Sequence, residues 1–179
     1  MSLQELPPDL PVPQDDRACD HLPGRELPDL FGLRAPGVLV LYLYPHMGDP
    51  SVGVPAGWDA IPGARGCTPQ SCGFRDLHGE IAATGARVVG LSTQSAEEQD
   101  ERADRLHLPF ALVSDPELRL RDALGLPTFE FPGRGELYRR LTLVARDGVI
   151  ERVFYPVFPP DRNAADVLAY LRASADRAS

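Results

Sequence analysis

Two of the three cysteines lie close together and could form a redox-active pair. Cys67 and Cys72 are separated by four residues, whereas Cys19 lies alone near the N-terminus. Cys67 stands at or just before the expected start of a helix, and Arg65 precedes it by two residues. The free backbone N–H groups at a helix start, the helix dipole and a neighbouring arginine all stabilise an anion. Because the thiolate is the reactive form of cysteine, Cys67 is the candidate nucleophile.

The spacing of this pair has a conformational consequence. On a helix, Cys67, Phe74 and Ile81 share one face, whereas Cys72 lies about 140° around the axis. The two cysteine Cα atoms would be about 9 Å apart in an intact helix, and a disulfide requires them within about 7 Å. We therefore expect a bond between the two sulfurs only if the start of the helix unwinds.

Other interpretations of the cysteines are simpler. A cysteine near a helix start is often a small buried hydrophobic residue. A zinc site would need two more ligands, for which His46 and His78 are the only nearby candidates. Cys19 lies in a segment that we expect to be mobile, and it is interpreted as an incidental thiol.

Composition favours one ordered domain and excludes several classes of protein. The chain has 179 residues, of which 43% are hydrophobic, and its net charge is −8. An acidic balance argues against binding nucleic acid or an anionic membrane, since both require clustered basic residues. Residues 1–16 lack the basic and apolar regions of a signal peptide, and the apolar run 38–43 is too short to span a bilayer. We therefore predict a cytoplasmic protein.

The pattern of strands and helices predicts an α/β fold. Residues 1–24 are rich in proline and are predicted to form a flexible arm, and residues 25–179 a single domain. The apolar run 38–44 is typical of a strand buried on both faces, and a long loop follows it. Alternating signals then predict a mixed central sheet with helices on both faces. The expected later elements are helix 68–84, strand 87–92, helix 95–106, strand 110–113, helix 115–124, hairpin strands 141–145 and 149–154 around Asp147-Gly148, and a helix from about 161.

The cysteine motif resembles that of the peroxiredoxins. It reads Gly-Cys-Thr-Pro from Gly66, then Cys72, then Phe-Arg-Asp from Phe74, and it follows a strand that ends at Tyr44-Pro45. It is most similar to the bacterioferritin-comigratory or Q-type subgroup, whose pattern is Gly-Cys-Thr-x-x-x-Cys-x-Phe-Arg-Asp. The resemblance extends from about residue 24 to residue 171. It implies a thioredoxin-like three-layer fold and a thiol-dependent peroxidase.

The resemblance also implies a reaction cycle. Cys67 would attack hydrogen peroxide or an organic hydroperoxide and become a sulfenic acid. Cys72 would resolve it to an intramolecular disulfide, which thioredoxin or a similar dithiol protein would reduce. No metal, haem or flavin cofactor is needed, because sulfur carries the electrons. Relatives of this type are often monomers, so we expect a monomer or a weak dimer.

The remaining site residues are expected from the same resemblance. Pro45 would shield the thiolate, and Gly66 and Thr68 would contact the peroxide. The family's late-strand arginine, which holds the thiolate and the peroxide, aligns with Arg139. Because side chains alternate along a strand, Arg140 would face the other way and is the competing assignment.

Three departures from the family pattern affect the site. Ala64 stands where the family has a threonine whose hydroxyl binds the peroxide. The loop before Cys67 is longer by about fifteen residues, so that Pro62 competes with Pro45 as the shield. The inserted segment, about 46–62, could be a lid or a packed surface loop in which Trp58 fills a hydrophobic notch. The third departure is Ala145, which replaces an aspartate of the family pattern.

Two other functions remain open at this point. Without a hydroxyl at position 64, the chain could be a redox sensor or a slow thiol oxidoreductase with the same disulfide and little peroxidase turnover. A disulfide reductase of the thioredoxin type is less favoured, since that chemistry uses Cys-x-x-Cys.

Overall fold

A five-stranded mixed sheet forms the centre of the molecule. The computed structural model describes residues 3–178, and its strands follow the order β3-β2-β1-β6-β7. The parallel strands are β1 (Val38–Leu43), β2 (Ala86–Ser92) and β3 (Ala111–Ser114). The strands β6 (Leu141–Arg146) and β7 (Val149–Phe154) run antiparallel and complete the sheet. The predicted mixed sheet and α/β class are confirmed.

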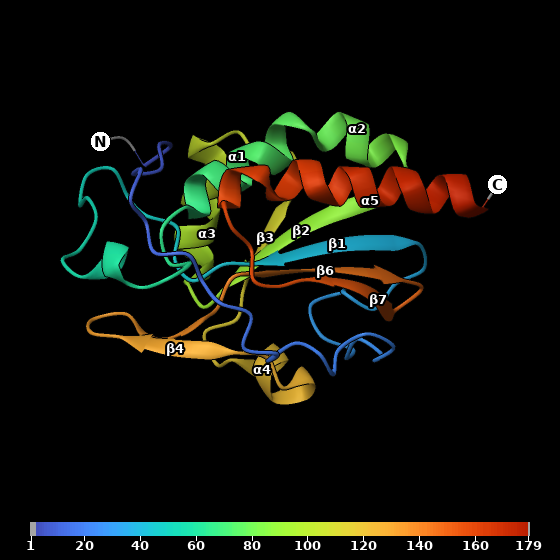
Figure 1. Ribbon diagram of the computed structural model, residues 1–179, viewed down its shortest axis with the longest axis horizontal. Coiled ribbons are helices and arrows are strands. Elements are labelled where there is room, and N and C mark those ends of the chain that lie inside the picture. Colours follow the sequence, from blue (N-terminus) through green and yellow to red (C-terminus); the bar gives the residue numbers. More distant parts are fainter. Residues whose placement is uncertain (1–2, 179) are drawn as a thin grey trace.

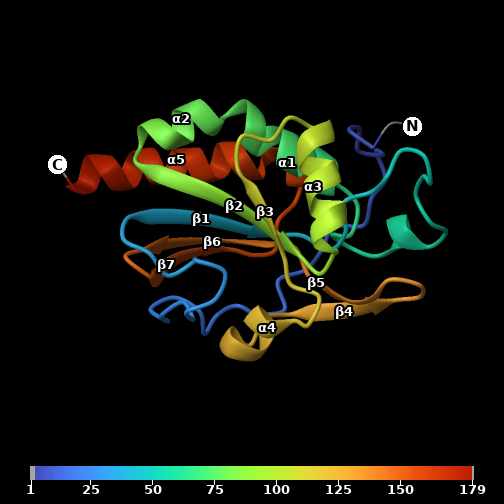
Figure 2. The ribbon, with the colours of Figure 1, turned by 180° about the vertical axis from the view of Figure 1, so that it is seen from behind.

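Helices cover both faces of this sheet, as Figures 1 and 2 show. One face carries α1 (Cys67–Asp76), α2 (His78–Ala83) and the long α5 (Asn163–Ala178). The opposite side carries α4 (Arg119–Leu124) and a small hairpin of β4 (Thr128–Phe131) and β5 (Gly135–Tyr138). The helix α3 (Ala96–Arg105) packs along β3. Two short 3-10 helices, η1 (Trp58–Ala60) and η2 (Pro160–Arg162), lie in the connecting segments.

Alternation along β1 explains why its sequence is apolar throughout. Leu39, Leu41 and Leu43 belong to one buried cluster, whereas Val40 and Tyr42 belong to the cluster that also contains Cys67 and Cys72. Successive side chains of a strand point to opposite faces, so a strand covered on both sides needs apolar residues at every position. The predicted doubly buried strand is confirmed, and it places the cysteines on the α1 side of the sheet.

Several predicted boundaries shift for identifiable reasons. The single predicted helix 68–84 is two helices, because the backbone leaves helical geometry at Leu77. Helix α4 begins only at Arg119, since the Asp115 side chain accepts the backbone N–H groups of Arg119 and Leu120 and residues 115–118 form a turn. The β4–β5 hairpin was not predicted. By contrast, the Ser95 cap and the 141–154 hairpin, with Asp147 and Gly148 at positive φ, are as expected.

The N-terminal segment packs against the domain, in contrast to the predicted flexible arm. Cys19 and Leu22 are buried in the cluster on the α4 side of the sheet. His21 Nε2 lies 2.8 Å from the Leu124 carbonyl oxygen, and the Gly24 N–H donates to the Ile150 carbonyl. Prolines prevent regular structure here, but they do not prevent apolar side chains from being buried. The division predicted at residue 24 is therefore not a boundary in packing. No helix within residues 3–178 has the length and apolarity that a membrane span requires.

Candidate active site

Cys67 is the first residue of α1 and is almost fully buried, with 4% of its surface exposed. Gly66 precedes it with φ +117°, a backbone conformation that side chains disfavour. A Cβ atom at Gly66 would also overlap the ring of Pro160. Glycine is thus required for the turn that presents Cys67 at the helix start, where backbone N–H groups stabilise an anion.

Arg140 is the arginine that contacts Cys67. Its Nη2 donates to Cys67 Sγ at 3.2 Å, and the residue is 3% exposed. Arg139, which we predicted for this place, lies with its guanidinium 5.3 Å from the centre of the Phe129 ring. The assignment to Arg139 is therefore corrected in favour of Arg140. Both residues lie in the two-residue connection between β5 and β6, so the geometry of that connection, and not the motif alignment, decides which arginine faces the thiol.

A buried polar network fixes Arg140 in this position. Its Nη1 donates to Gln70 Oε1 at 2.6 Å, and its Nε and Nη2 donate to the carbonyls of Gly63 and Ala64. Gln70 in turn donates to Asn163 of α5 at 3.0 Å. Gln70 was not among the predicted site residues, although its position one turn after Cys67, on a helix packed in the core, indicates that it lies near the thiol. Buried networks of this kind hold a charged group in one orientation.

A small cavity lies beside the thiol. Its volume is about 20 Å³, and Gly66 and Thr68, the two residues expected to contact the peroxide, are among its lining residues. Neither Pro45 nor Pro62, the two prolines proposed to shield the thiolate, lines this cavity. Pro55 of the inserted segment does. Pro62 lines a separate cavity of about 370 Å³, which Arg139 and Arg140 also line. The lining residues at Cys67 are Leu3, His46, Gly48, Gly53, Val54, Pro55, Trp58, Arg65, Gly66, Cys67, Thr68 and Arg134.

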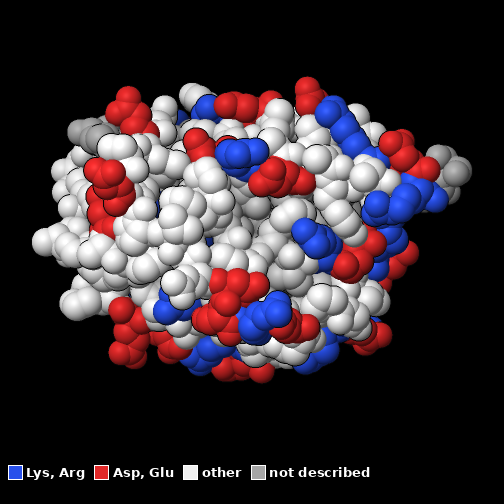
Figure 3. Space-filling view, in the orientation of Figure 1, with Lys and Arg blue, Asp and Glu red and all other residues white. Residues whose placement is uncertain are grey.

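The inserted segment covers this cavity. Trp58 is 3% exposed and packs edge-on against Phe131 of β4, with ring centroids 5.0 Å apart. The Arg134 guanidinium lies 4.5 Å from the Trp58 ring centre. Trp58 therefore fills a hydrophobic notch, as the packed-loop interpretation expects, and it also lines the cavity at Cys67. Over this end of the molecule, the face in Figure 3 shows mainly uncharged side chains with a few acidic ones.

Cys72 is also buried in α1, and no disulfide is present. All three cysteines are free thiols. Burial raises the pKa of Cys72, although Arg75 acts in the opposite direction. Because one continuous helix contains both Cys67 and Cys72, their sulfurs can join only after the start of α1 unwinds, as the spacing predicts.

Cys19 is a buried core residue and not a thiol on a mobile arm. Burial raises its pKa to about 12, and the nearby Asp16 acts in the same direction. A thiol that stays protonated at neutral pH is a poor nucleophile. Cys19 is therefore not a candidate for the redox chemistry.

His46 is a titratable residue of the cavity whose charge state depends on folding. Burial lowers its pKa to about 4, and Arg134 and Arg102 act in the same direction, whereas Glu98 opposes them. At neutral pH the imidazole is thus uncharged. The 3.7 Å separation between His46 Nε2 and Glu98 Oε2 is then not an ion pair.

This shift predicts that acid destabilises the protein through His46. The ordinary pKa of the imidazole is 6.5, so the unfolded chain gains this proton below pH 6.5 and the folded protein only near pH 4. The free energy of unfolding should fall by about 3 kcal/mol over this range through His46 alone. Urea denaturation at pH 7.5 and pH 4 measures this fall. The free energy of unfolding of a His46→Gln variant should fall by about 3 kcal/mol less than that of the wild type. If acid between these pH values made the wild type more stable relative to the variant, His46 would instead be charged and paired with Glu98.

Comparison with known proteins identifies the family. The model of the family described as Redoxin matches residues 35–170. The curated protein "Peroxiredoxin Q, chloroplastic" of Sedum lineare is 35% identical over 111 residues, covering 60% of this chain and 57% of the relative. The chain spans about half the length of the curated relatives that it matches.

Solved structures share the fold of this chain. The peroxidoxin BcpB of Mycobacterium tuberculosis superposes with a TM-score of 0.63 at 29% identity, covering 85% of this chain and 94% of that one. The bacterioferritin comigratory protein of Xanthomonas campestris gives 0.61 at 26% identity, covering 79% and 82%. The thioredoxin-like fold, the cysteine at the start of α1 and the family match together show that this chain belongs to the Redoxin family and groups there with the peroxiredoxins of the Q or bacterioferritin-comigratory type.

Proposed function

We propose that this protein is a thiol peroxidase in which Cys67 reduces peroxides. The contact that carries the proposal is the 3.2 Å hydrogen bond from Arg140 to Cys67 Sγ. A guanidinium at this distance stabilises a thiolate and the charge that develops during its attack. The sulfur takes one peroxide oxygen and is oxidised to a sulfenic acid, while the other oxygen leaves as water or an alcohol. The similar Xanthomonas protein is described as having alkyl peroxide reduction activity, which supports the same class of reaction here.

We further propose that Cys72 resolves the sulfenic acid. Its thiol would condense with the Cys67 sulfenic acid to give an intramolecular disulfide and water. Since α1 holds the two residues on different faces, this step requires the first turns of α1 to open. A dithiol protein of the thioredoxin kind would then reduce the disulfide and restore both thiols. Such a cycle requires a reducing compartment, which the predicted cytoplasmic location would provide.

Mass spectrometry after one equivalent of peroxide tests the cycle directly. Trypsin cuts after Arg65 and Arg75, so both active cysteines fall on one peptide, whereas Cys19 falls on another. We expect the peptide 66–75 to become two hydrogens lighter and to resist alkylation, and the Cys19 peptide to stay fully alkylated. In a Cys72→Ser variant the same peptide should instead accumulate the sulfenic acid and, with excess peroxide, the sulfinic acid. A Cys72→Ser variant that cycles normally with a dithiol reductant would remove Cys72 from the mechanism.

A peroxide sensor is the second candidate, and Ala64 is the observation that favours it. No side-chain hydroxyl is available at position 64, where the family pattern has threonine. Loss of one hydrogen bond in a transition state commonly costs about 10²–10³ in rate. Stopped-flow measurement of Cys67 oxidation separates the two functions. A rate constant far above that of free cysteine supports the peroxidase, and one close to free cysteine supports the sensor.

A further inference from the structure

Two buried polar atoms near Cys67 have no partner in the protein. Among residues 3–178, His46 Nδ1 and Arg65 Nε are the only buried side-chain nitrogen or oxygen atoms without a hydrogen bond. Both residues line the cavity at Cys67. An unpaired buried donor or acceptor costs about 1–3 kcal/mol, so such groups are rare unless a ligand or water uses them. Because both residues line the cavity beside the candidate nucleophile, their unpaired atoms indicate a site for a small polar molecule.

We propose that His46 and Arg65 bind the peroxide, and that the cavity admits hydrogen peroxide in preference to hydroperoxides with a bulky alkyl group. This inference rests on the proposed function of Cys67. It assigns to two residues of this chain the contact that Ala64 cannot make. It also gives the inserted segment a role in choosing the substrate.

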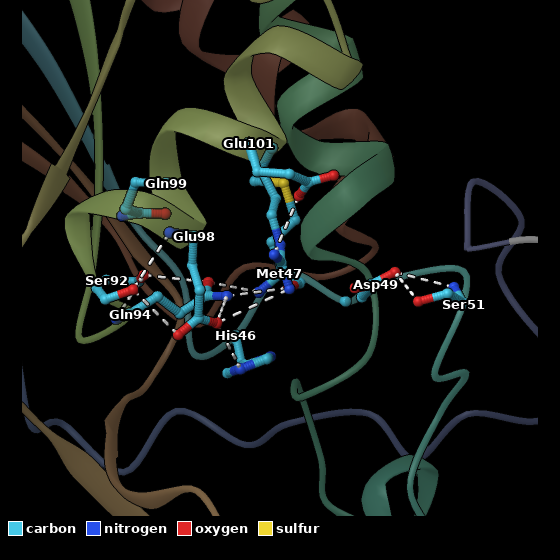
Figure 4. A network of polar contacts seen from close by, with 12 residues as sticks. His46, Met47, Asp49, Ser51, Ser92, Gln94, Glu98, Gln99 and Glu101 are labelled. Carbon is cyan, nitrogen blue, oxygen red and sulfur yellow. Dashed lines mark hydrogen bonds and ion pairs between the residues drawn. The ribbon is translucent and has the colours of Figure 1, made fainter.

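The position of His46 is fixed by its neighbour in the chain. The Met47 N–H donates to Gln94 Oε1 at 2.8 Å, and Gln94 Nε2 donates to the Met47 carbonyl at 3.0 Å. Arg102 Nε donates to the same carbonyl at 3.2 Å. Figure 4 shows this network, with His46 placed next to Glu98 of α3. The backbone next to His46 is thus anchored at Met47 to α3 and to the connection between β2 and α3, and the imidazole is not carried on a freely moving loop.

The two side chains offer complementary hydrogen-bonding groups. The imidazole is neutral at pH 7, and the Glu98 carboxylate 3.7 Å from Nε2 favours the tautomer with its proton on that nitrogen. His46 Nδ1 is then an acceptor. Arg65 binds both carboxylate oxygens of Asp59 through Nη1, at 2.8 and 2.9 Å, which leaves its Nε–H as a donor. Hydrogen peroxide carries an O–H group for the first and an oxygen lone pair for the second.

These groups match the charge that moves in the reaction. Cys67 sulfur donates an electron pair to one oxygen, the S–O bond forms, and the O–O bond breaks. The departing oxygen gains negative charge and takes up a proton to become water, so that one thiol and one hydrogen peroxide give one sulfenic acid and one water. A buried N–H donor such as Arg65 Nε–H stabilises that developing charge more strongly than it stabilises the neutral peroxide.

The size of the cavity sets the substrate preference. Its volume is about 20 Å³, and a single water requires about 10–15 Å³ measured in this way. The two oxygens of hydrogen peroxide fit this space with little rearrangement. A bulky alkyl group does not fit inside this volume, so it would have to extend out of the cavity or displace Trp58, which is packed against Phe131. Larger hydroperoxides should therefore react more slowly.

The test compares rates of Cys67 oxidation with hydrogen peroxide and with cumene hydroperoxide. Trp58 is the only tryptophan of the chain and lines the cavity, so its fluorescence can follow the wild-type reaction. Rapid alkylation and mass spectrometry of the tryptic peptide that contains Cys67 follow it in every variant; this peptide is 66–75, except in Arg65→Met, where the missing cleavage site extends it to 35–75. We expect the wild type to react at least about tenfold faster with hydrogen peroxide. Comparable rates with the two peroxides would overturn the size preference.

Variants of the two residues test the binding contacts. His46→Phe and Arg65→Met should each slow oxidation by hydrogen peroxide at least about tenfold. Arg65→Lys keeps a charge for Asp59 but has no Nε donor, so it should show the same loss as Arg65→Met. The matched controls are His78→Phe, since His78 packs against Phe110, and Arg139→Met, and both should stay within about twofold of the wild type. Unchanged rates in the folded His46 and Arg65 variants would refute the contacts.

Removing side chains of the inserted segment that line the cavity should weaken the preference for hydrogen peroxide. Trp58→Ala should raise the rate with cumene hydroperoxide relative to hydrogen peroxide. Val54→Ala is the milder variant, because Val54 also lines the cavity and is 37% exposed, so it should fold even if Trp58→Ala does not. If the ratio of the rates with the two peroxides is unchanged in Val54→Ala and in any folded Trp58→Ala variant, the inserted segment does not limit access to the cavity. The inference and the proposed function fail separately: slow wild-type oxidation by both peroxides refutes the peroxidase, whereas fast oxidation that is insensitive to His46 and Arg65 refutes only the inference.

Discussion

A Cys67→Ser variant is expected to lose rapid peroxide reduction, by about 10³-fold or more. The serine hydroxyl is not ionised at neutral pH and is a weak nucleophile without an adjacent base. The fold should survive, because a hydroxyl can take the place of the thiol, which accepts from Arg140 Nη2 and faces the Ala64 carbonyl oxygen at 3.9 Å. Peroxide consumption with dithiothreitol as the reductant measures the effect, and circular dichroism checks the fold.

Cys19→Ala is the matched control for the loss of a thiol. Cys19 is buried on the other side of the sheet, and its thiol stays protonated because burial raises its pKa to about 12. The control should keep the wild-type rate of peroxide consumption, with only a modest loss of stability from the missing sulfur. A Cys67→Ser variant with wild-type activity, or a Cys19→Ala variant without any, would move the chemistry away from the start of α1.

Arg140→Met should lower the rate of Cys67 oxidation about 10²–10³-fold at pH 7. The guanidinium stabilises the thiolate and the charge that develops on the reacting atoms, and a methionine can do neither. Arg140→Lys keeps the charge but loses the planar guanidinium that also reaches Gln70. Its rate should therefore lie between those of the wild type and Arg140→Met. Stopped-flow fluorescence of Trp58 measures all three rates.

Two further measurements make the Arg140 result interpretable. Removing the guanidinium leaves Gln70 Oε1 and the Gly63 and Ala64 carbonyls without this donor, which should cost about 1–3 kcal/mol of stability. The rate is therefore compared at a temperature where urea denaturation shows the variant to be folded. Arg139→Met removes a guanidinium that lies on Phe129 and should change the rate less than about twofold. The opposite ranking of the two arginines would restore the assignment made from the motif.

Local sequence signals determined the elements that place the nucleophile. The continuous apolar run of β1 requires a strand covered on both faces, and Gly66 allows the positive φ before α1. The five-residue step from Cys67 to Cys72 is fixed by helix geometry, so their separation on α1 followed from the sequence. The hairpin at Asp147-Gly148 and the Ser95 cap are likewise local, since a few neighbouring residues determine their backbone.

The tertiary structure alone decided which distant side chains complete the site. The choice between Arg139 and Arg140 depends on the connection between β5 and β6, and Gln70 matters only because Arg140 is brought beside it. His46 and Arg65 meet in one cavity because the inserted segment folds over α1. The proline-rich N-terminal segment packs down for the same kind of reason: its leucines bury against α4 and β7, elements that lie far along the chain. Sequence spacing carries information about neighbours within a few turns, whereas these contacts depend on packing between elements whose relative placement no local pattern encodes.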